Sequence, residues 1–120
     1  MSVLFVDDDP EILSIYKKQA ERTGIKKFDM ASNGAEAWNL LQKNEYTFVF
    51  ADLKMPKMDG ITLMEKLADE MKDSAPTVVI VSGDSNMLHK AMKKFGSVNI
   101  LAKPIQNKDF TDLIARLSIC

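Results

Sequence analysis

The sequence lacks the features that would place the chain outside the cell, in a membrane or on a polyanion. Its 120 residues include one cysteine, Cys120, so no disulfide can form within the chain, and a reducing, cytoplasmic location is expected. Basic and acidic residues number 16 and 17, a net charge of −1, so overall charge predicts neither direct nucleic-acid binding nor membrane binding. The longest apolar runs, such as TVVIV, are too short to span a bilayer.

Linkers, internal repeats and low-complexity segments are also missing. The first residues, MSVLFVDDD, have neither the basic region nor the long apolar region of a secretion signal. The composition, 46% hydrophobic and 28% charged, is that of an ordinary globular protein. Residues 1–120 are therefore predicted to form a single domain.

Short apolar runs alternate with helical patterns along the whole chain. The runs predict strands at 2–6, 28–31, 47–51, 77–82 and 99–102. Apolar residues at helical spacing predict helices at 11–23, 34–43, 61–71, 86–95 and 107–118. This alternation predicts an α/β fold, a (βα)5 doubly wound parallel five-stranded sheet with helices on both faces. The second and fifth strands are shorter and more polar, so they are expected at the edges.

The predicted helices carry local start and stop signals. Asn33, Ser85 and Asn107 each stand just before or at the start of a helical pattern and are predicted N-caps. Gly24 follows the first helix and is the predicted stop.

Polar residues close four of the predicted strands. In a parallel sheet of strand order 2-1-3-4-5, the carboxyl ends of strands one, three, four and five are neighbours, and ligands bind at that edge. The side chains expected to converge there are Asp7, Asp8, Asp52, Ser82 and Lys103.

These residue types point to phosphoryl chemistry. Several carboxylates placed together are costly unless a cation joins them, and hard oxygen ligands suit Mg²⁺ better than zinc. A lysine and a hydroxyl beside them can bind an anion. Asp7 and Asp8 are adjacent and suited to the metal, while Asp52 stands alone on the central strand. Asp52 is therefore the predicted nucleophile, which would form an acyl phosphate.

Four segments, VDDDP, DLKMPKMDG, VIVSGDS and ILAKP, resemble in order the signature segments of response-regulator receiver domains over essentially the whole chain. The resemblance implies a flavodoxin-like fold, phosphorylation on Asp52 and Mg²⁺ held by Asp7, Asp8, Asp52 and the backbone carbonyl of Lys54. Asp9 would then begin the first helix.

The same resemblance assigns roles to the last two segments. It implies that Ser82 and Lys103 contact the phosphoryl oxygens, and that the Lys103–Pro104 peptide bond is cis.

A receiver domain would act in two-component or phosphorelay signalling. The expected donor is a sensor histidine kinase, a histidine phosphotransfer protein or a small acyl phosphate, and the modified state would bind an unidentified target differently. Such a chain is not an enzyme with a separate substrate, although it catalyses its own phosphorylation and dephosphorylation. Ile12, Ile15 and Lys18 on the first helix are the candidate docking patch for the partner.

Two features leave alternatives open. The family usually has Tyr or Phe three residues before the lysine, where this chain has Ile100, so a degenerate receiver that acts as a phosphorylation-independent interaction module remains an alternative. An aspartyl-phosphate phosphatase is less favoured, because Lys54 occupies the place where that chemistry needs an acid or base. The chain stops soon after the last predicted helix, which is compatible with a stand-alone receiver, a relay intermediate or a fragment of a larger regulator.

Overall fold

The computed structural model describes residues 2–52, 60–71, 76–83, 85–95, 99–103 and 106–119. The strands are β1 (Ser2–Val6), β2 (Lys27–Ala31), β3 (Phe48–Asp52), β4 (Thr77–Ser82) and β5 (Asn99–Ala102). The helices are α1 (Pro10–Arg22), α2 (Gly34–Lys43), α3 (Gly60–Lys66), α4 (Ser85–Phe95) and α5 (Asn107–Ile119). A wider π-helical turn, η1 (Leu67–Met71), continues α3, where the sequence predicted one regular helix. The other predicted elements agree with the structure to within one residue at each end.

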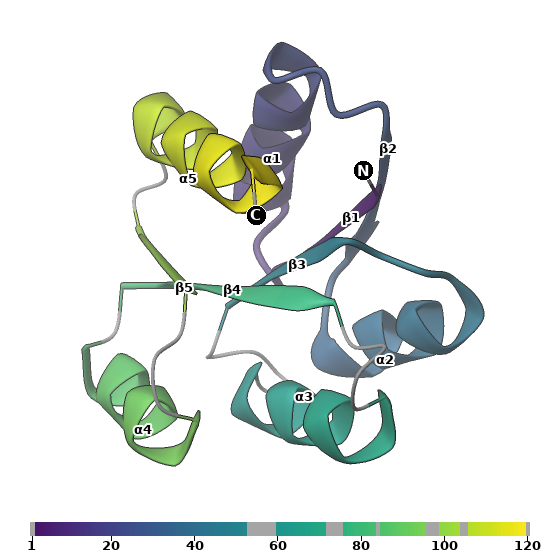
Figure 1. The fold of residues 1–120 in the computed structure, drawn as a ribbon, viewed down its shortest axis with the longest axis vertical. Coiled ribbons are helices and arrows are strands. Elements are labelled where there is room, and N and C mark those ends of the chain that lie inside the picture. Colours follow the sequence, from purple (N-terminus) through teal and green to yellow (C-terminus); the bar gives the residue numbers. More distant parts are fainter. Residues whose placement is uncertain are drawn as a thin grey trace.

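The five strands form one parallel sheet in the order β2-β1-β3-β4-β5, as predicted. Helices α1 and α5 cover one face, and α2, α3 and α4 cover the other (Figure 1). All five residues of the central strand β3 are buried, whereas the edge strand β2 exposes Lys27, Asp29 and Met30. The apolar run of β3 is thus explained by helices on both sides of the sheet.

Alternation along the strands divides the core into separate layers. Val3, Phe5, Phe48 and Phe50 pack on the α1/α5 side, and Leu4, Val6, Val49 and Ala51 pack on the α2/α3 side. Side chains two residues apart on a strand share a face. Asp7 and Asp52 follow Phe5 and Phe50 by two positions, so they lie at the end of the α1/α5 layer.

An aromatic group fills the α1/α5 layer. Phe5 lies at its centre, with ring centroids 4.6 Å from Tyr16, 5.3 Å from Phe50, 5.9 Å from Phe28 and 6.2 Å from Phe110. Offset and tilted ring contacts at these distances add specific geometry to the burial of apolar area.

The ends of α1 are defined by hydrogen bonds. Asp9 is its N-cap, since the Asp9 side chain accepts from the Glu11 amide at 2.9 Å, and Pro10 begins the first turn. At the other end Gly24, with φ +80°, donates to the Glu21 carbonyl, and Ile25 donates to that of Ala20. This is the Schellman arrangement, which confirms Gly24 as the stop.

Of the predicted N-caps, Asn33 is confirmed and Asn107 is wrong. The Asn33 side chain accepts from the Glu36 amide at 2.8 Å. The first carbonyl of α5 belongs instead to Gln106, which accepts from the Phe110 amide. The Asn107 side chain turns to α1 and accepts from Gln19 Nε2 at 3.3 Å, because the two helices pack side by side. The Ser85 side chain lies outside the described residues.

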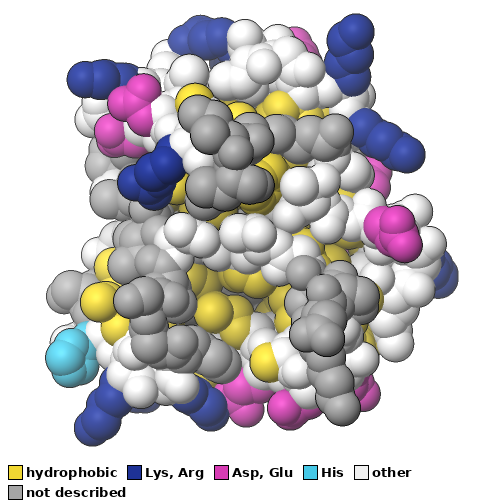
Figure 2. All heavy atoms as spheres, viewed as in Figure 1, with side chains coloured by type: hydrophobic (Ala, Val, Ile, Leu, Met, Phe, Trp, Pro, Cys, Tyr) yellow, Lys and Arg dark blue, Asp and Glu magenta, His cyan; other side chains and the backbone are white. Residues whose placement is uncertain are grey.

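Charges of both signs are spread around the rim of the face drawn in Figure 2, and neither sign covers it. This agrees with the nearly balanced composition. Within the described part of the chain, no helix has the length and apolar character needed to cross a bilayer.

Candidate functional site

The predicted site residues lie at the carboxyl edge of the sheet. Asp7 directly follows β1, Asp52 ends β3, Ser82 ends β4 and Lys103 follows β5. The strand register aligns these ends, with Val6 beside Ala51, Asp52 beside Val81 and Ser82 beside Ala102. The sheet therefore brings together side chains that are up to about a hundred positions apart in the sequence.

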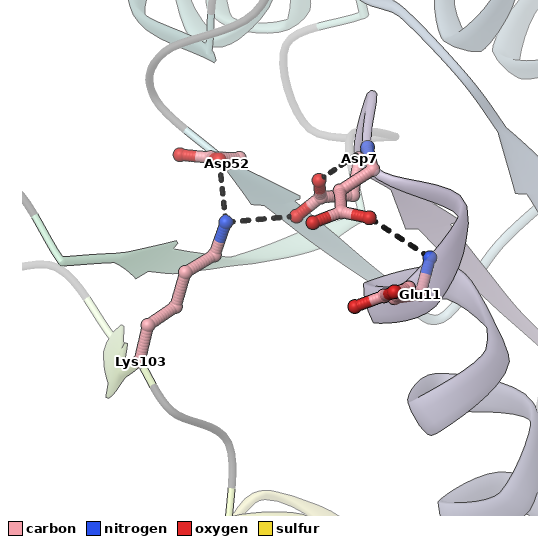
Figure 3. A network of polar contacts seen from close by, with 5 residues as sticks. Asp7, Glu11, Asp52 and Lys103 are labelled. Carbon is pink, nitrogen blue, oxygen red and sulfur yellow. Dashed lines mark hydrogen bonds and ion pairs between the residues drawn. The ribbon is translucent and has the colours of Figure 1, made fainter.

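Lys103 joins two of the carboxylates. Its ammonium lies 2.7 Å from Asp52 Oδ2 and 3.0 Å from Asp7 Oδ2, so it reaches across from the end of β5 to the ends of β3 and β1 (Figure 3). Asp7, Asp52 and Lys103 follow Phe5, Phe50 and Leu101 by two positions, so all three close the α1/α5 layer. The aromatic residues of the core therefore lie directly beneath the carboxylates of this site.

Asp7, Asp8 and Asp52 form an acidic cluster in which one oxygen of each carboxylate lies within 4.8 Å of those of the others. Asp7 and Asp52 are buried and Asp8 is exposed. The single ammonium of Lys103 leaves the cluster with more negative than positive charge. Hard, closely spaced oxygens with excess negative charge fit a divalent cation such as Mg²⁺.

The three consecutive aspartates have different surroundings. Asp7 Oδ1 accepts a hydrogen bond from the Asp9 amide at 2.9 Å, while the Asp9 side chain caps α1. The Asp7 amide donates to the Ala31 carbonyl on β2 at 3.1 Å, which fixes its backbone at the edge of the sheet. The expectation that Asp9 begins the helix is confirmed by the hydrogen bond that its side chain accepts from the Glu11 amide. Asp8 makes no capping contact among the described residues and is exposed beside the cluster.

Burial raises the pKa of the Asp7 carboxyl above its usual value. The hydrogen bond from Asp9 and the positive charge of Lys103 oppose this rise, and the negative charge of Asp52 adds to it. Burial alone would lower the pKa of the Lys103 ammonium, but its interactions with Asp52 and Asp7 outweigh burial and raise it above the usual value. Lys103 is therefore protonated at neutral pH, and Asp7 is the strained member of the group.

Ser82 is buried at the end of β4. It alternates with Val79 and Val81 of the α1/α5 layer, so its side chain leaves the strand on the other face, as Ile80 does. The Ser82 carbonyl accepts from the Lys103 amide at 3.4 Å, which connects the ends of β4 and β5.

The candidate docking residues lie on α1, which begins beside the acidic cluster. Ile15 is 36% exposed and Lys18 is exposed, whereas Ile12 is half-buried and packs against the core. Two of the three residues thus present a free surface.

Some sequence expectations lie outside the described residues. These are the Lys54 carbonyl, the Lys103–Pro104 peptide bond and the side chain of Ile100.

Two features of the site were not predicted from the sequence. The first is the double ion pair of Lys103 with Asp7 and Asp52, since the positive charge of Lys103 was expected to bind an incoming anion. The second is the buried hydroxyl of Tyr16 on the core-facing side of α1. A tyrosine and a glutamine, Gln19, one turn apart on a core-facing stripe were the available signal.

The strand order, with helices on both faces, places the chain in the flavodoxin-like class of α/β domains. The family model "Response regulator receiver domain" matches residues 3–115, so the chain belongs to the receiver domains of two-component response regulators. The expectation from the four sequence segments is confirmed.

Two relatives differ in the share of their own length that this chain matches. A "Chemotaxis protein CheY homolog" of Campylobacter jejuni is 33% identical over 106 residues, 87% of this chain and 82% of that protein. "Response regulator Rre1" of Synechocystis sp. is 33% identical over 82 residues, 68% of this chain. That match spans only 36% of the Synechocystis protein.

Solved structures agree with this assignment. The receiver domain of Francisella response regulator 1452 superposes with a TM-score of 0.79 at 32% identity, covering 98% of this chain and 93% of that chain. A CheY-like receiver domain from Methylobacillus flagellatus gives a TM-score of 0.85 at 25% identity, covering 98% of both chains.

Replacing Lys103 tests its role as the counter-charge of the cluster. Lys103→Met should lower the free energy of unfolding without divalent cations by about 2 kcal/mol, because Asp7 and Asp52 lose their shared partner. The value is below that of fully buried pairs because the lysine side chain is 24% exposed. Urea unfolding in chelator measures it, and added Mg²⁺ should restore part of the loss. Equal stability of variant and wild type in chelator would contradict the role.

The pH dependence of stability tests the strain at Asp7. A carboxyl whose pKa is raised on folding favours the folded state fully at pH values below its unfolded pKa, and this contribution is lost as pH rises through the raised pKa. At neutral pH without metal, Asp7→Asn should therefore unfold at a higher temperature than the wild type, and the difference should shrink towards pH 4. Thermal unfolding across this range checks it, with the exposed neighbour Asp8→Asn as control. A less stable Asp7→Asn at neutral pH would show that pairing with Lys103 outweighs burial.

Proposed function

We propose that this receiver domain is a signalling switch that accepts one phosphoryl group on the Asp52 carboxylate. The observation that carries the proposal is the position of the Lys103 ammonium, 2.7 Å from Asp52 and 3.0 Å from Asp7 in a cluster of carboxylates. A carboxylate nucleophile held beside a cation site and a fixed positive charge meets the needs of phosphoryl transfer, which depends on positioning and charge neutralisation.

In the proposed reaction an Asp52 oxygen attacks the phosphorus of a phosphohistidine or a small acyl phosphate. The new P–O bond forms as the bond to the leaving imidazole nitrogen or carboxylate oxygen breaks, and the product is an aspartyl phosphate. Attack by water on that phosphorus later returns the carboxylate and releases inorganic phosphate. Both half-reactions are the chain's own, so it needs no separate substrate.

Each neighbouring residue has a part in this scheme. Asp7, Asp8 and Asp52, with the Lys54 carbonyl that the sequence resemblance implies, would hold Mg²⁺, which offsets the negative charge of the transferring group. Lys103 would move from the carboxylates to a phosphoryl oxygen, since its ammonium already lies against Asp52. Ser82 would donate its hydroxyl to another such oxygen from the end of β4.

The partner proposed as phosphoryl donor is a sensor histidine kinase or a histidine phosphotransfer protein. The docking patch, Ile12, Ile15 and Lys18, lies on the helix that starts beside the cluster, where a partner that delivers a phosphohistidine to Asp52 must approach. Lys103, which pairs with Asp52, directly follows β5, the strand that contains Ile100, so movement of the lysine would shift the end of that strand.

Phosphorylation is tested by intact mass after incubation with Mg²⁺ and a small acyl phosphate. The wild type should gain one phosphoryl group, and the gain should vanish in Asp52→Asn or with a chelator, because both nucleophile and cation are needed. Asp9→Asn is the matched control, since asparagine caps a helix as well as aspartate and Asp9 is outside the cluster. This variant should be phosphorylated like the wild type.

No adduct on the wild type, together with no Mg²⁺ binding, would contradict the proposal. It would favour the phosphorylation-independent interaction module instead. An adduct that persists in Asp52→Asn would place the phosphoryl group on another residue.

The docking patch is tested by separating the donors. Ile15→Glu should slow phosphotransfer from a histidine kinase that phosphorylates the wild type by about tenfold, the effect of losing an interface anchor. Phosphorylation by a small acyl phosphate should not change. Met30→Glu is the matched control, because Met30 is a similarly exposed apolar side chain, at 38% against 36%, on the edge strand β2. Equal rates for Ile15→Glu and Met30→Glu with the kinase would rule the patch out.

A further inference from the structure

The hydroxyl of Tyr16 is a buried donor without a partner. The Tyr16 side chain has no exposed area, and no atom of the described residues accepts a hydrogen bond from its hydroxyl. A buried hydroxyl left in this state costs free energy, and most buried polar groups in folded proteins have a hydrogen-bond partner in the protein or in ordered water.

The Tyr16 ring lies directly below the acidic cluster. It stacks on Phe5 with centroids 4.6 Å apart and an interplanar angle of 19°, and it lies 6.0 Å from Phe50. Asp7 and Asp52 follow these two phenylalanines by two positions on the same face of the sheet. The polar end of that layer is therefore formed by the two carboxylates.

The direction of the helix places the hydroxyl towards the cluster. Long side chains on an α-helix point back towards its N-terminus, and α1 begins at Pro10, beside Asp7. Burial, and then the negative charges of Asp7 and Asp52, raise the pKa of the Tyr16 phenol well above its usual value. The phenol therefore stays protonated and is a donor, and it lies near enough to feel both carboxylates.

Asp7 offers the matching acceptor. Oδ1 of Asp7 is occupied by the Asp9 amide, whereas Oδ2 is buried and accepts no hydrogen bond from the described residues. Its contact is the ion pair with Lys103 at 3.0 Å. Among the described residues, this layer thus contains a buried hydroxyl donor without an acceptor, and beside it a buried carboxylate oxygen whose contact is the Lys103 ammonium.

We infer that Tyr16 is a positioning residue for Asp7. The Tyr16 hydroxyl donates to Asp7 Oδ2, directly or through one buried water, when a divalent cation holds the cluster and displaces the Lys103 ammonium from Asp7. The hydrogen bond orients the carboxylate from below, and hydrogen bonds of this kind to metal-binding carboxylates strengthen metal affinity. The inference rests on the proposed function, because it concerns the same site.

The competing explanation is a purely structural one, in which the hydroxyl serves the α1/α5 interface. Gln19, one turn further from the cluster, also has a buried oxygen, Oε1, without a partner in the described part of the chain. Its amide nitrogen already donates to Asn107 at 3.3 Å. A water that joins Tyr16 to Gln19 would affect stability and leave the cation site unchanged.

The two tyrosines of the chain provide a matched experiment. Tyr46 is also buried, but its hydroxyl donates to Asp29 at 2.6 Å, far from the cluster along β2. Tyr16→Phe should raise the Mg²⁺ dissociation constant about tenfold in calorimetric titration, the lower end of the effect of such supporting hydrogen bonds. Its unfolding midpoint in chelator should be unchanged or higher, since an unpaired hydroxyl is removed. Tyr46→Phe should show the opposite pattern, with lower stability and unchanged Mg²⁺ affinity.

A spectroscopic measurement on the unaltered Tyr16 keeps the inference testable if Tyr16→Phe fails to fold. In Tyr46→Phe, which leaves one tyrosine, Mg²⁺ should slow the exchange of the hydroxyl proton with water in the NMR spectrum. Wild-type Mg²⁺ affinity in Tyr16→Phe, or hydroxyl exchange that Mg²⁺ does not change, would overturn the inference. A wild type that binds no Mg²⁺ would overturn the proposed cation site itself, so the two failures are distinguishable.

Discussion

The contact between one ammonium and two carboxylates, Lys103 with Asp52 at 2.7 Å and with Asp7 at 3.0 Å, joins the ends of three strands at the functional edge of the sheet. Like charges on β1 and β3 would otherwise be buried side by side with nothing between them, which is among the most costly arrangements in a folded protein. The lysine makes the arrangement tolerable, but one positive charge does not balance the three carboxylates of the cluster. The site therefore has excess negative charge that a divalent cation can neutralise.

This imbalance explains why the buried Asp7 carboxylate is unfavourable for stability. Burial raises the pKa of Asp7 even though a backbone amide and a lysine contact it, so ionisation of this carboxyl is less favourable in the folded state than in the unfolded chain. The aromatic group under the cluster, with Phe5 and Phe50 followed by Asp7 and Asp52, gives the carboxylates a well-packed apolar layer on their inner side. A binding site that needs strained charges is supported here by a well-packed layer, as is common where function opposes stability.

Much of the fold was predictable because each strand and helix carries its own pattern. The apolar runs of β1, β3 and β4 and the helical stripes between them gave element boundaries to within one residue, and alternation gave the parallel sheet. Helix caps were predicted correctly where the hydrogen-bond partner is close in sequence, as with Asn33, whose side chain accepts from the Glu36 amide three residues on. The prediction failed where a distant segment competed, since Asn107 bonds to Gln19 on α1 and leaves the start of α5 to Gln106. The change from α3 to the wider turn η1 also has no visible signal in the periodicity.

The sequence by itself determined which chemical groups the site contains. The residue types can be read directly, and in a parallel sheet the residues at the carboxyl ends of the strands form the ligand-binding edge. The sequence placed Asp7, Asp8, Asp52, Ser82 and Lys103 at one edge and identified the family through four ordered segments. Only the tertiary structure decided how these groups meet. The position of Lys103 between Asp7 and Asp52 and the burial of the Tyr16 hydroxyl below the cluster depend on distances between segments far apart in the chain. Such distances follow from the packing of helices on the sheet, which no local pattern of residues encodes.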